Sequence, residues 1–144
     1  MGRETVYCVV DILIEKDGKI VLIRRANDPF KGSRAIPGGF VDPGETAERA
    51  AVREAKEETG LDVEVTDIVG VYSDPERDPR GASLSVAFAA KVTGGELKGG
   101  DDASDAEWAD LSKVGGMKIA FDHPKILRDY LRWKKGKGTY WSTK

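Results

Sequence analysis

One segment, from Thr46 to Gly60, constrains the fold of this chain more than any other. Thr46 has a side chain of the kind that caps helix N-termini, and Gly60 can adopt the left-handed conformation in which many helices end. The segment therefore predicts a helix from Thr46 to Thr59. On a helical wheel, three alanines share one face with three glutamates, while Thr59 points the other way. This face consists of Ala47, Ala50, Ala51, Glu54, Glu57 and Glu58.

The three glutamates repel one another, because side chains three and four positions apart on a helix are neighbours. A solvated surface is the usual fate of such a charge cluster. Here, however, the alanines let one end of the face approach a sheet closely, so that the carboxylates are presented at the other end. Carboxylate oxygens are hard ligands that suit Mg²⁺ or Mn²⁺ and not zinc. The pattern therefore predicts a divalent-metal site at Glu54, Glu57 and Glu58.

The rest of the chain predicts strands around this helix. Runs rich in β-branched residues at 5–15, 19–25, 63–73 and 84–92, and a shorter run around Trp108, are typical of strands. A second helix is predicted from His123 to Trp133. This order predicts an α/β fold with a mixed sheet between helices. With 144 residues there is room for one domain, which we assign to residues 1–135, and we expect residues 136–144 to form a mobile tail.

Composition excludes several classes of protein. Lys and Arg total 23 against 25 Asp and Glu, which argues against a nucleic-acid binder that relies on phosphate contacts. No run of 18 apolar residues is present, so we expect no membrane span. The single cysteine, Cys8, excludes an intramolecular disulfide and a cysteine-based zinc site. We expect a cytoplasmic protein in which Cys8 is buried and inert in its strand.

The glutamate-rich helix lies within a longer pattern that runs from Gly39 to Leu61. Every fixed position of G-x5-E-x7-R-E-U-x-E-E-x-G-U is occupied, where U is an aliphatic or small apolar residue. The fixed positions are Gly39, Glu45, Arg53, Glu54, Glu57, Glu58 and Gly60, with Ala55 and Leu61 at the U positions. The segment resembles the Nudix box, and the strand order around it is similar to the Nudix fold. This resemblance implies an α/β/α sandwich that hydrolyses a diphosphate joining a nucleoside to a second moiety.

The resemblance also implies roles for residues of the box. Glu54, Glu57 and Glu58 would be the metal ligands, with one of them also a candidate for removing a proton from water. Arg53 would orient a carboxylate rather than contact substrate. Gly39 and Gly44 would allow the backbone to turn sharply near the metal.

Two residues outside the box have alternative interpretations. Asp102, in a loop after Gly99, is a candidate for an extra ligand or the general base, but an ordinary turn with a capping aspartate explains it equally well. His123 precedes Pro124 at the start of a helix, and we interpret it as structural rather than catalytic.

The loop from Ser73 to Gly81 narrows the expected substrate. Its sequence, SDPERDPRG, resembles the corresponding loop of microbial ADP-ribose pyrophosphatases in this family. The resemblance implies cleavage of ADP-ribose to AMP and ribose 5-phosphate. Arg77 and Arg80 in the loop, together with Arg25 at the end of the second strand, are the predicted phosphate or ribose contacts, because a guanidinium group offers forked donors.

Other activities and the oligomeric state stay open. Ala82 stands where this subgroup commonly has histidine, and Arg34 where it commonly has tryptophan. A nucleoside triphosphate pyrophosphohydrolase acting on, for example, oxidised dGTP is therefore an alternative, and a non-catalytic ADP-ribose sensor is a further one. The resemblance also implies a homodimer. Trp133, Tyr140 and Trp141 are candidate interface residues, and core positions would explain them equally well.

Overall fold

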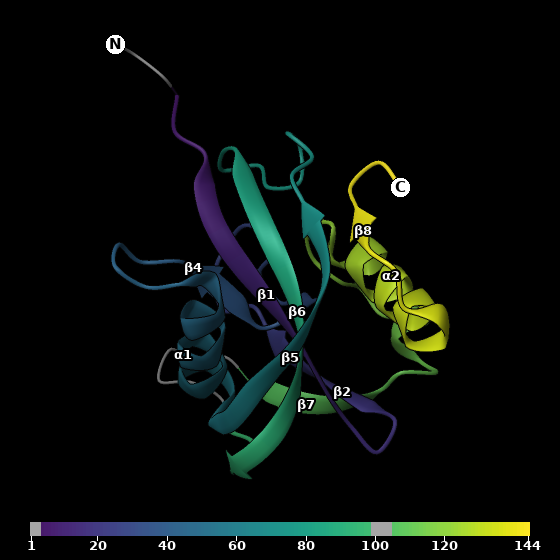
Figure 1. Ribbon diagram of the computed structural model, residues 1–144. Helices are drawn as coiled ribbons and strands as arrows, with labels where there is room; N and C mark the ends of the chain where they lie inside the picture. Colours follow the sequence, from purple (N-terminus) through teal and green to yellow (C-terminus); the bar gives the residue numbers. More distant parts are fainter. Residues whose placement is uncertain (1–3, 99–104) are drawn as a thin grey trace.

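The computed structural model describes residues 4–98 and 105–144 (Figure 1). Its elements, in chain order, are β1 (Tyr7–Lys16), β2 (Lys19–Arg24), β3 (Arg34–Ala35), β4 (Gly38–Phe40), α1 (Ala47–Thr59), β5 (Leu61–Tyr72), β6 (Ser83–Gly95), β7 (Ala106–Asp110), a 3-10 turn (Val114–Gly116), α2 (His123–Gly136) and β8 (Tyr140–Trp141). The two helices and the long strands fall where the sequence predicts them. The short strands β3, β4 and β8 are additions.

The sheet is mixed and lies between the two helices. Its strand order is β3-β2-β1-β6-β5-β8, with β4 paired to β1 and β7 paired to β2. Strand β1 is antiparallel to β2 and β4 but parallel to β6. In Figure 1, α1 and α2 cover opposite sides of the strands, which confirms the predicted α/β sandwich. Among the described residues, neither helix is both long and apolar enough to cross a bilayer.

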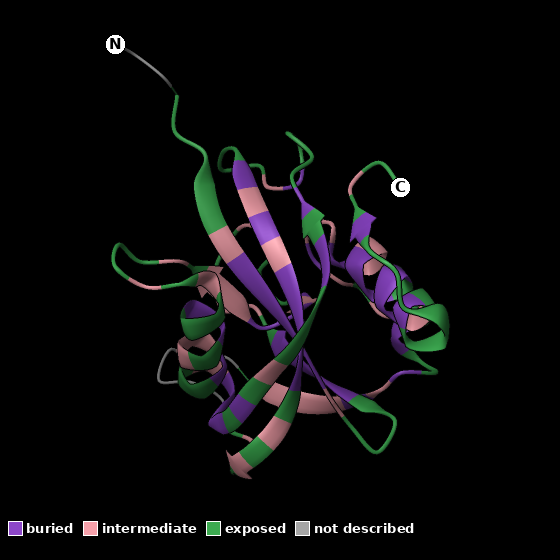
Figure 2. Ribbon diagram, in the orientation of Figure 1, coloured by how far each residue is buried: buried purple, intermediate pink, exposed green. Residues whose placement is uncertain are grey.

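Alternation along β1 divides the core into two layers. Ile12 and Ile14 pack on the side of α1, while Leu13 packs on the side of α2, because successive side chains of a strand point to opposite faces. Both layers are buried along the middle of the strands (Figure 2). On the α1 side the helix contributes only small side chains to the fully buried core, Ala50, Ala51 and Ala55. This helix therefore lies close to the sheet.

The last residues of the chain pack on the sheet, where we expected a mobile tail. Strand β8 runs parallel to β5, with Tyr140 opposite Gly70. A Cβ atom on Gly70 would overlap the backbone of Tyr140, so the missing side chain is what lets the segment dock. Beyond β8, the Ser142 hydroxyl accepts hydrogen bonds from the backbone amides of Ser73 (2.8 Å) and Asp74 (3.1 Å). The sheet therefore extends past residue 135.

Two other expectations about single residues are wrong. Cys8 is exposed, because it lies near the end of β1 that extends beyond the core. Thr59 is fully buried, and its hydroxyl donates to the carbonyl of Ala55 and accepts from the amide of Leu61. The three aromatic residues considered for an interface differ in burial: Trp133 and Tyr140 are buried in the core, whereas Trp141 is exposed.

Candidate active site

The glutamate face of α1 lies against the glycines of β4. Thr46 caps the helix by accepting a hydrogen bond from the amide of Arg49, and Gly60 ends it at a φ of 79°. An added Cβ on Gly39 would overlap the carboxylate of Glu54, and one on Gly38 would overlap the backbone of Val10. Glycine at these positions is what brings the helix carboxylates next to β1.

Arg53 gathers the acidic residues around this contact. Its guanidinium group forms a two-point contact with Glu45, at 3.1 and 2.6 Å. It also donates to Glu54 (2.8 Å), Glu57 (3.3 Å) and the carbonyl of Phe40 (3.0 Å). Hydrogen bonds from Arg53 hold the pKa of Glu45 at about 2, so that side chain is ionised at neutral pH. Arg53 thus orients carboxylates, as the sequence pattern implies.

Glu58 is a largely buried carboxyl group that the described residues leave only partly satisfied. Burial raises the pKa of Glu58 to about 8, and the nearby charges of Glu54 and Asp11 raise it further, while a hydrogen bond from Gly38 opposes the shift. Its Oε2 atom is buried and has no hydrogen-bond partner among the described residues. An unpaired carboxylate oxygen at this depth is costly unless a positive group meets it.

The donor set at this point fits a divalent cation. Burial also raises the pKa of Glu54, whose side chain is only 14% exposed, so two crowded carboxylates lack sufficient positive charge. Glu57 is 59% exposed and turned toward Arg53. The described part of the chain contains no ready-made cluster of three acidic, histidine or cysteine side chains around one point. Glu54 and Glu58 are in place for a hard cation, whereas Glu57 would have to leave Arg53 to join them.

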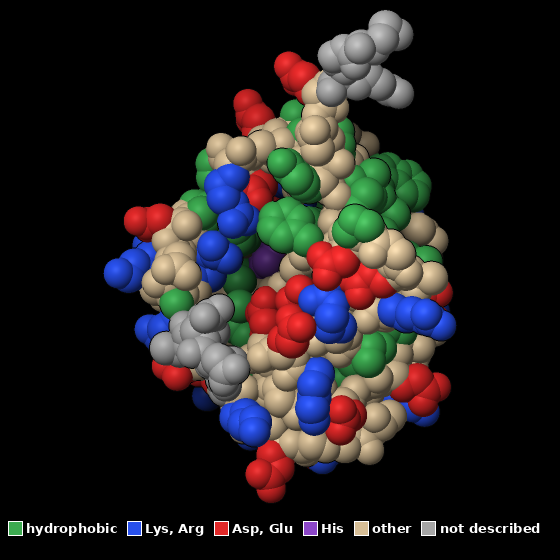
Figure 3. All heavy atoms as spheres, turned by 90° about the vertical axis from the view of Figure 1, so that its left-hand side faces the viewer, with side chains coloured by type: hydrophobic (Ala, Val, Ile, Leu, Met, Phe, Trp, Pro, Cys, Tyr) green, Lys and Arg blue, Asp and Glu red, His purple; other side chains and the backbone are tan. Residues whose placement is uncertain are grey.

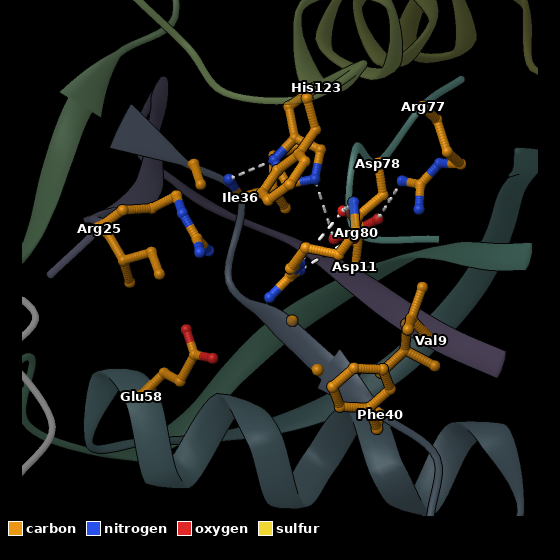
Figure 4. Close-up of a pocket in the computed structure, with 16 residues that line it drawn as sticks. Val9, Asp11, Arg25, Ile36, Phe40, Glu58, Arg77, Asp78, Arg80 and His123 are labelled. Atoms are coloured by element: carbon orange, nitrogen blue, oxygen red, sulfur yellow. Dashed lines mark hydrogen bonds and ion pairs between the residues drawn. The ribbon is translucent and has the colours of Figure 1, made fainter. Parts of the chain in front are cut away.

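A cavity of about 100 Å³ opens in front of Glu58. Figure 4 shows Glu58 rising into it from α1, with Arg25 and Arg80 reaching in from the opposite side. Figure 3 shows the same hollow on the surface, with His123 at its bottom and acidic and basic side chains on its rim. The structure thus brings together Glu58, Arg25 and Arg80, three of the residues singled out from the sequence.

Arg77 is placed differently from the sequence prediction. Its side chain is 5% exposed and makes a two-point contact with Asp122, at 2.9 and 2.8 Å. Its remaining nitrogen donates to the Ser83 hydroxyl at 2.8 Å, and Asp11 lies 3.4 Å away. With these contacts Arg77 ties the loop of residues 73–82 to the residue before α2, to β6 and to β1. It lines the cavity, but most of its donors are used within the protein.

Asp11 and His123 form part of the cavity floor, and sequence reasoning missed the first of them. Asp11 accepts a hydrogen bond from Ser85 at 2.6 Å and lies 3.2 Å from Nε2 of His123. The Nδ1 atom of His123 accepts from the amide of Ile36 at 3.0 Å. Nε2 therefore carries the proton and points at Asp11, which fits the structural role expected of His123. A single aspartate inside the apolar strand CVVDILI was the signal for Asp11.

The remaining candidates have simple placements. Gly44 lies in a turn at a φ of 88°, a conformation that favours glycine. Asp102 lies outside the described residues, so its suggested role as ligand or base stays a prediction.

Comparison with known proteins agrees with this geometry. Over residues 4–133 the chain matches the NUDIX domain. It is 60% identical over 127 residues to the ADP-ribose pyrophosphatase of Methanocaldococcus jannaschii, and the alignment covers 88% of this chain and 74% of that protein. These matches confirm the resemblance seen in the sequence.

Solved structures share the fold. A NUDIX hydrolase from Nitrosomonas europaea superposes with a TM-score of 0.84 at 24% identity, covering 98% of this chain and 80% of the other. The NUDIX domain of Shewanella oneidensis NrtR, solved in complex with ADP ribose, superposes with a TM-score of 0.78 at 26% identity, covering 90% and 89%. The sandwich of sheet and helices is common to all three chains.

Gly39 offers a test of the close contact between β4 and α1. Gly39→Ala is expected to push the carboxylate of Glu54 away and to lower the free energy of unfolding by at most about 1 kcal/mol, the low end for overpacking, because the displaced group is the end of a flexible side chain. Urea unfolding measures the change. The control is Gly115→Ala, since nothing lies within 4 Å of a Cβ added there. Adding Glu54→Ala to Gly39→Ala should restore part of the loss. Equal stability of the Gly39 and Gly115 variants would contradict the close contact.

Proposed function

The chain belongs to the Nudix family, and on that premise we propose that it hydrolyses ADP-ribose to AMP and ribose 5-phosphate with the help of a divalent cation. The 60% identity to a protein named ADP-ribose pyrophosphatase supports the substrate. The glutamate face of α1 supports the requirement for a cation, for which Mg²⁺ is the first candidate and Mn²⁺ the second.

The observation that carries this proposal is that one cavity has an acidic side chain on one side and two basic side chains on the other. Glu58 lines one side with an unpartnered oxygen, and Arg25 and Arg80 line the other. A diphosphate is itself negative, so it fits the arginine wall and is repelled by the glutamate wall. A cation between glutamate and phosphate removes that conflict and matches the charges of both.

Each box residue then has a defined task. Glu54, Glu57 and Glu58 would hold the cation, which when bound neutralises phosphate charge and lowers the pKa of water. Arg53 fixes Glu54 and Glu57 in orientation by hydrogen bonds to both. Gly39 lets Glu54 reach this position.

The hydrolysis itself requires attack by water on one phosphorus atom. A new P–O bond forms, the bond to the bridging oxygen breaks, and that oxygen leaves with the other phosphate. Arg25 and Arg80 would donate hydrogen bonds to the non-bridging oxygens, where charge accumulates. The water proton passes to a carboxylate, for which we propose Glu54, Glu57 or Asp102.

We also propose that the protein is a homodimer and acts in the cytoplasm. The exposed Trp141 on β8 lies opposite Val71 of β5, itself partly exposed, so an apolar strip is available at this edge of the sheet. Aromatic side chains of this kind are enriched in interfaces.

The metal ligands can be tested by removing charge without changing size. Glu57→Gln and Glu58→Gln are each expected to lower kcat by about 10²-fold or more, because the cation loses a ligand. Affinity for Mn²⁺, measured by calorimetry on the unmodified and variant proteins, should fall in parallel. Glu48→Gln, an exposed glutamate of the same helix, is the control and should change neither value. Unchanged Mn²⁺ affinity in both ligand variants would refute the assignment.

The substrate can be tested with a panel of nucleotides and one arginine variant. The unmodified enzyme is expected to prefer ADP-ribose. Arg80→Ala should lower kcat/KM for ADP-ribose about tenfold or more, since a charge-assisted contact to phosphate is lost. Arg49→Ala, an exposed arginine on α1, is the control. Hydrolysis of oxidised dGTP at least tenfold more efficiently than ADP-ribose would favour the triphosphate pyrophosphohydrolase instead.

The oligomeric state has a direct measurement. A homodimer of a 15.7 kDa chain should give a mass near twice that value by light scattering at micromolar protein. Trp141→Glu should shift the mass toward the monomer by placing a charge in the apolar strip. A monomeric mass for the unmodified protein would overturn the proposal.

A further inference from the structure

Phe121 lines the cavity and contacts both arginines of its basic wall. The guanidinium carbon of Arg25 lies 4.9 Å from the centre of the Phe121 ring, and that of Arg80 lies 5.6 Å from it. These distances are typical of an attraction between a cation and the negative face of an aromatic ring. Arg25 follows β2 and Arg80 belongs to the loop before β6, so one ring contacts two segments that lie far apart in the sequence.

The backbone at Phe121 has a conformation that a bulky residue rarely adopts. Its φ is 56°, in the left-handed region where glycine and asparagine are common. Neighbouring hydrogen bonds fix the turn: Ala120 donates to the carbonyl of Arg34 at 2.8 Å, and His123 donates to the carbonyl of Ala120 at 3.2 Å. A strained residue held in this way at a cavity is a sign that its side chain is needed there.

Both arginines keep donors available after their protein contacts are counted. The Nε atom of Arg25 donates to the carbonyl of Pro29 at 2.7 Å, and no other hydrogen bond from its guanidinium group is formed with the described residues. Arg80 uses Nε and one terminal nitrogen on Asp78, which leaves the other terminal nitrogen. Burial lowers the pKa of Arg25, and the charge of Arg80 lowers it further, so the two cations repel each other.

We propose that Phe121 is a positioning residue that sets specificity for a diphosphate, by holding the guanidinium groups of Arg25 and Arg80 together in the cavity before substrate arrives. The inference rests on the proposed function, in which these arginines bind the phosphates. Asp78 and Glu58 offset part of the repulsion between the two arginines, and Asp78 holds Arg80 by hydrogen bonds. The ring face adds an attraction to each guanidinium group, so that less rearrangement is needed when substrate binds.

The competing explanation is that Phe121 serves only to pack against its apolar neighbours. Two variants distinguish this packing role from the attraction of the ring for the arginines. Phe121 also contacts Phe30, with ring centres 4.9 Å apart, and packs against Ala120 and its neighbours. Phe121→Leu keeps an apolar side chain without a ring, whereas Phe121→Tyr keeps the ring. Neither leucine nor tyrosine is β-branched, so each should tolerate the left-handed backbone at position 121 about as well as phenylalanine does. Phe121→Met is a second ring-free variant in case the leucine protein does not fold.

Steady-state kinetics with ADP-ribose give the first measurement. Phe121→Leu is expected to raise KM about tenfold and to leave kcat within about twofold, because the ring acts on binding and not on bond cleavage. Phe121→Tyr should stay within about twofold of the unmodified enzyme in both parameters. An unchanged KM in the leucine variant, an equal loss in both variants, or a fall in kcat alone would overturn the inference.

The position of the arginines can be measured without activity. Side-chain N–H signals of Arg25 and Arg80 in NMR spectra should move in Phe121→Leu, because the ring current is lost, while the signal of Arg53 serves as the internal control. Calorimetric binding of ADP to the metal-free protein should weaken about tenfold in the same variant. If ADP-ribose is not hydrolysed but these two results hold, the proposed substrate fails and the role of Phe121 stands. If ADP-ribose is hydrolysed but neither the arginine signals nor the affinity for ADP changes in Phe121→Leu, Phe121 serves packing alone and the inference is wrong.

Discussion

The close approach of α1 to the sheet is the contact on which the site depends. Alanines form the buried side of the helix, Gly39 on β4 leaves room for the Glu54 carboxylate, and Gly38 lets β4 lie close to β1. An added Cβ on Gly39 would meet the end of the Glu54 side chain, so that carboxylate would have to move away from β4. The small residues around them therefore let Glu58 line the cavity and let Glu54 lie against β4. The glycines are as much a part of the site as the acids.

The same contact creates an electrostatic imbalance that the chain only partly corrects. Arg53 is shared among Glu45, Glu54 and Glu57, and it leaves Glu58 with an unpartnered oxygen. A second arginine beside Glu58 would correct the imbalance, but it would also occupy the place of a cation. Arg25 and Arg80, which keep donors available, line another part of the cavity. Under the proposed function, this separation of the two signs would accommodate a cation and a diphosphate together.

Local signals in the sequence were sufficient for the helices, the long strands and the box, because caps and apolar periodicity act over a few residues. The contacts of Arg77 could not be predicted in this way, since its partners Asp11 and Asp122 lie 66 and 45 positions away in the chain. A charged loop arginine looks the same in the sequence whether it binds substrate or holds the fold. Phe121 was missed for a similar reason. Its left-handed backbone is set by tertiary hydrogen bonds, and the glycine from which such a conformation is usually predicted is absent at this position.

The docking of β8 beside Gly70 gives the last residues of the chain an influence on the cavity. Ser142 accepts hydrogen bonds from Ser73 and Asp74, the first residues of the loop that carries Arg77 and Arg80. A polar tail that looks dispensable in the sequence thus acts as a brace for the loop. Trimming the chain before Tyr140 to ease crystallisation, or attaching a rigid fusion partner there, would loosen a binding element about seventy positions earlier in the chain. Enzyme engineering on this scaffold should therefore leave the segment intact and place its additions elsewhere.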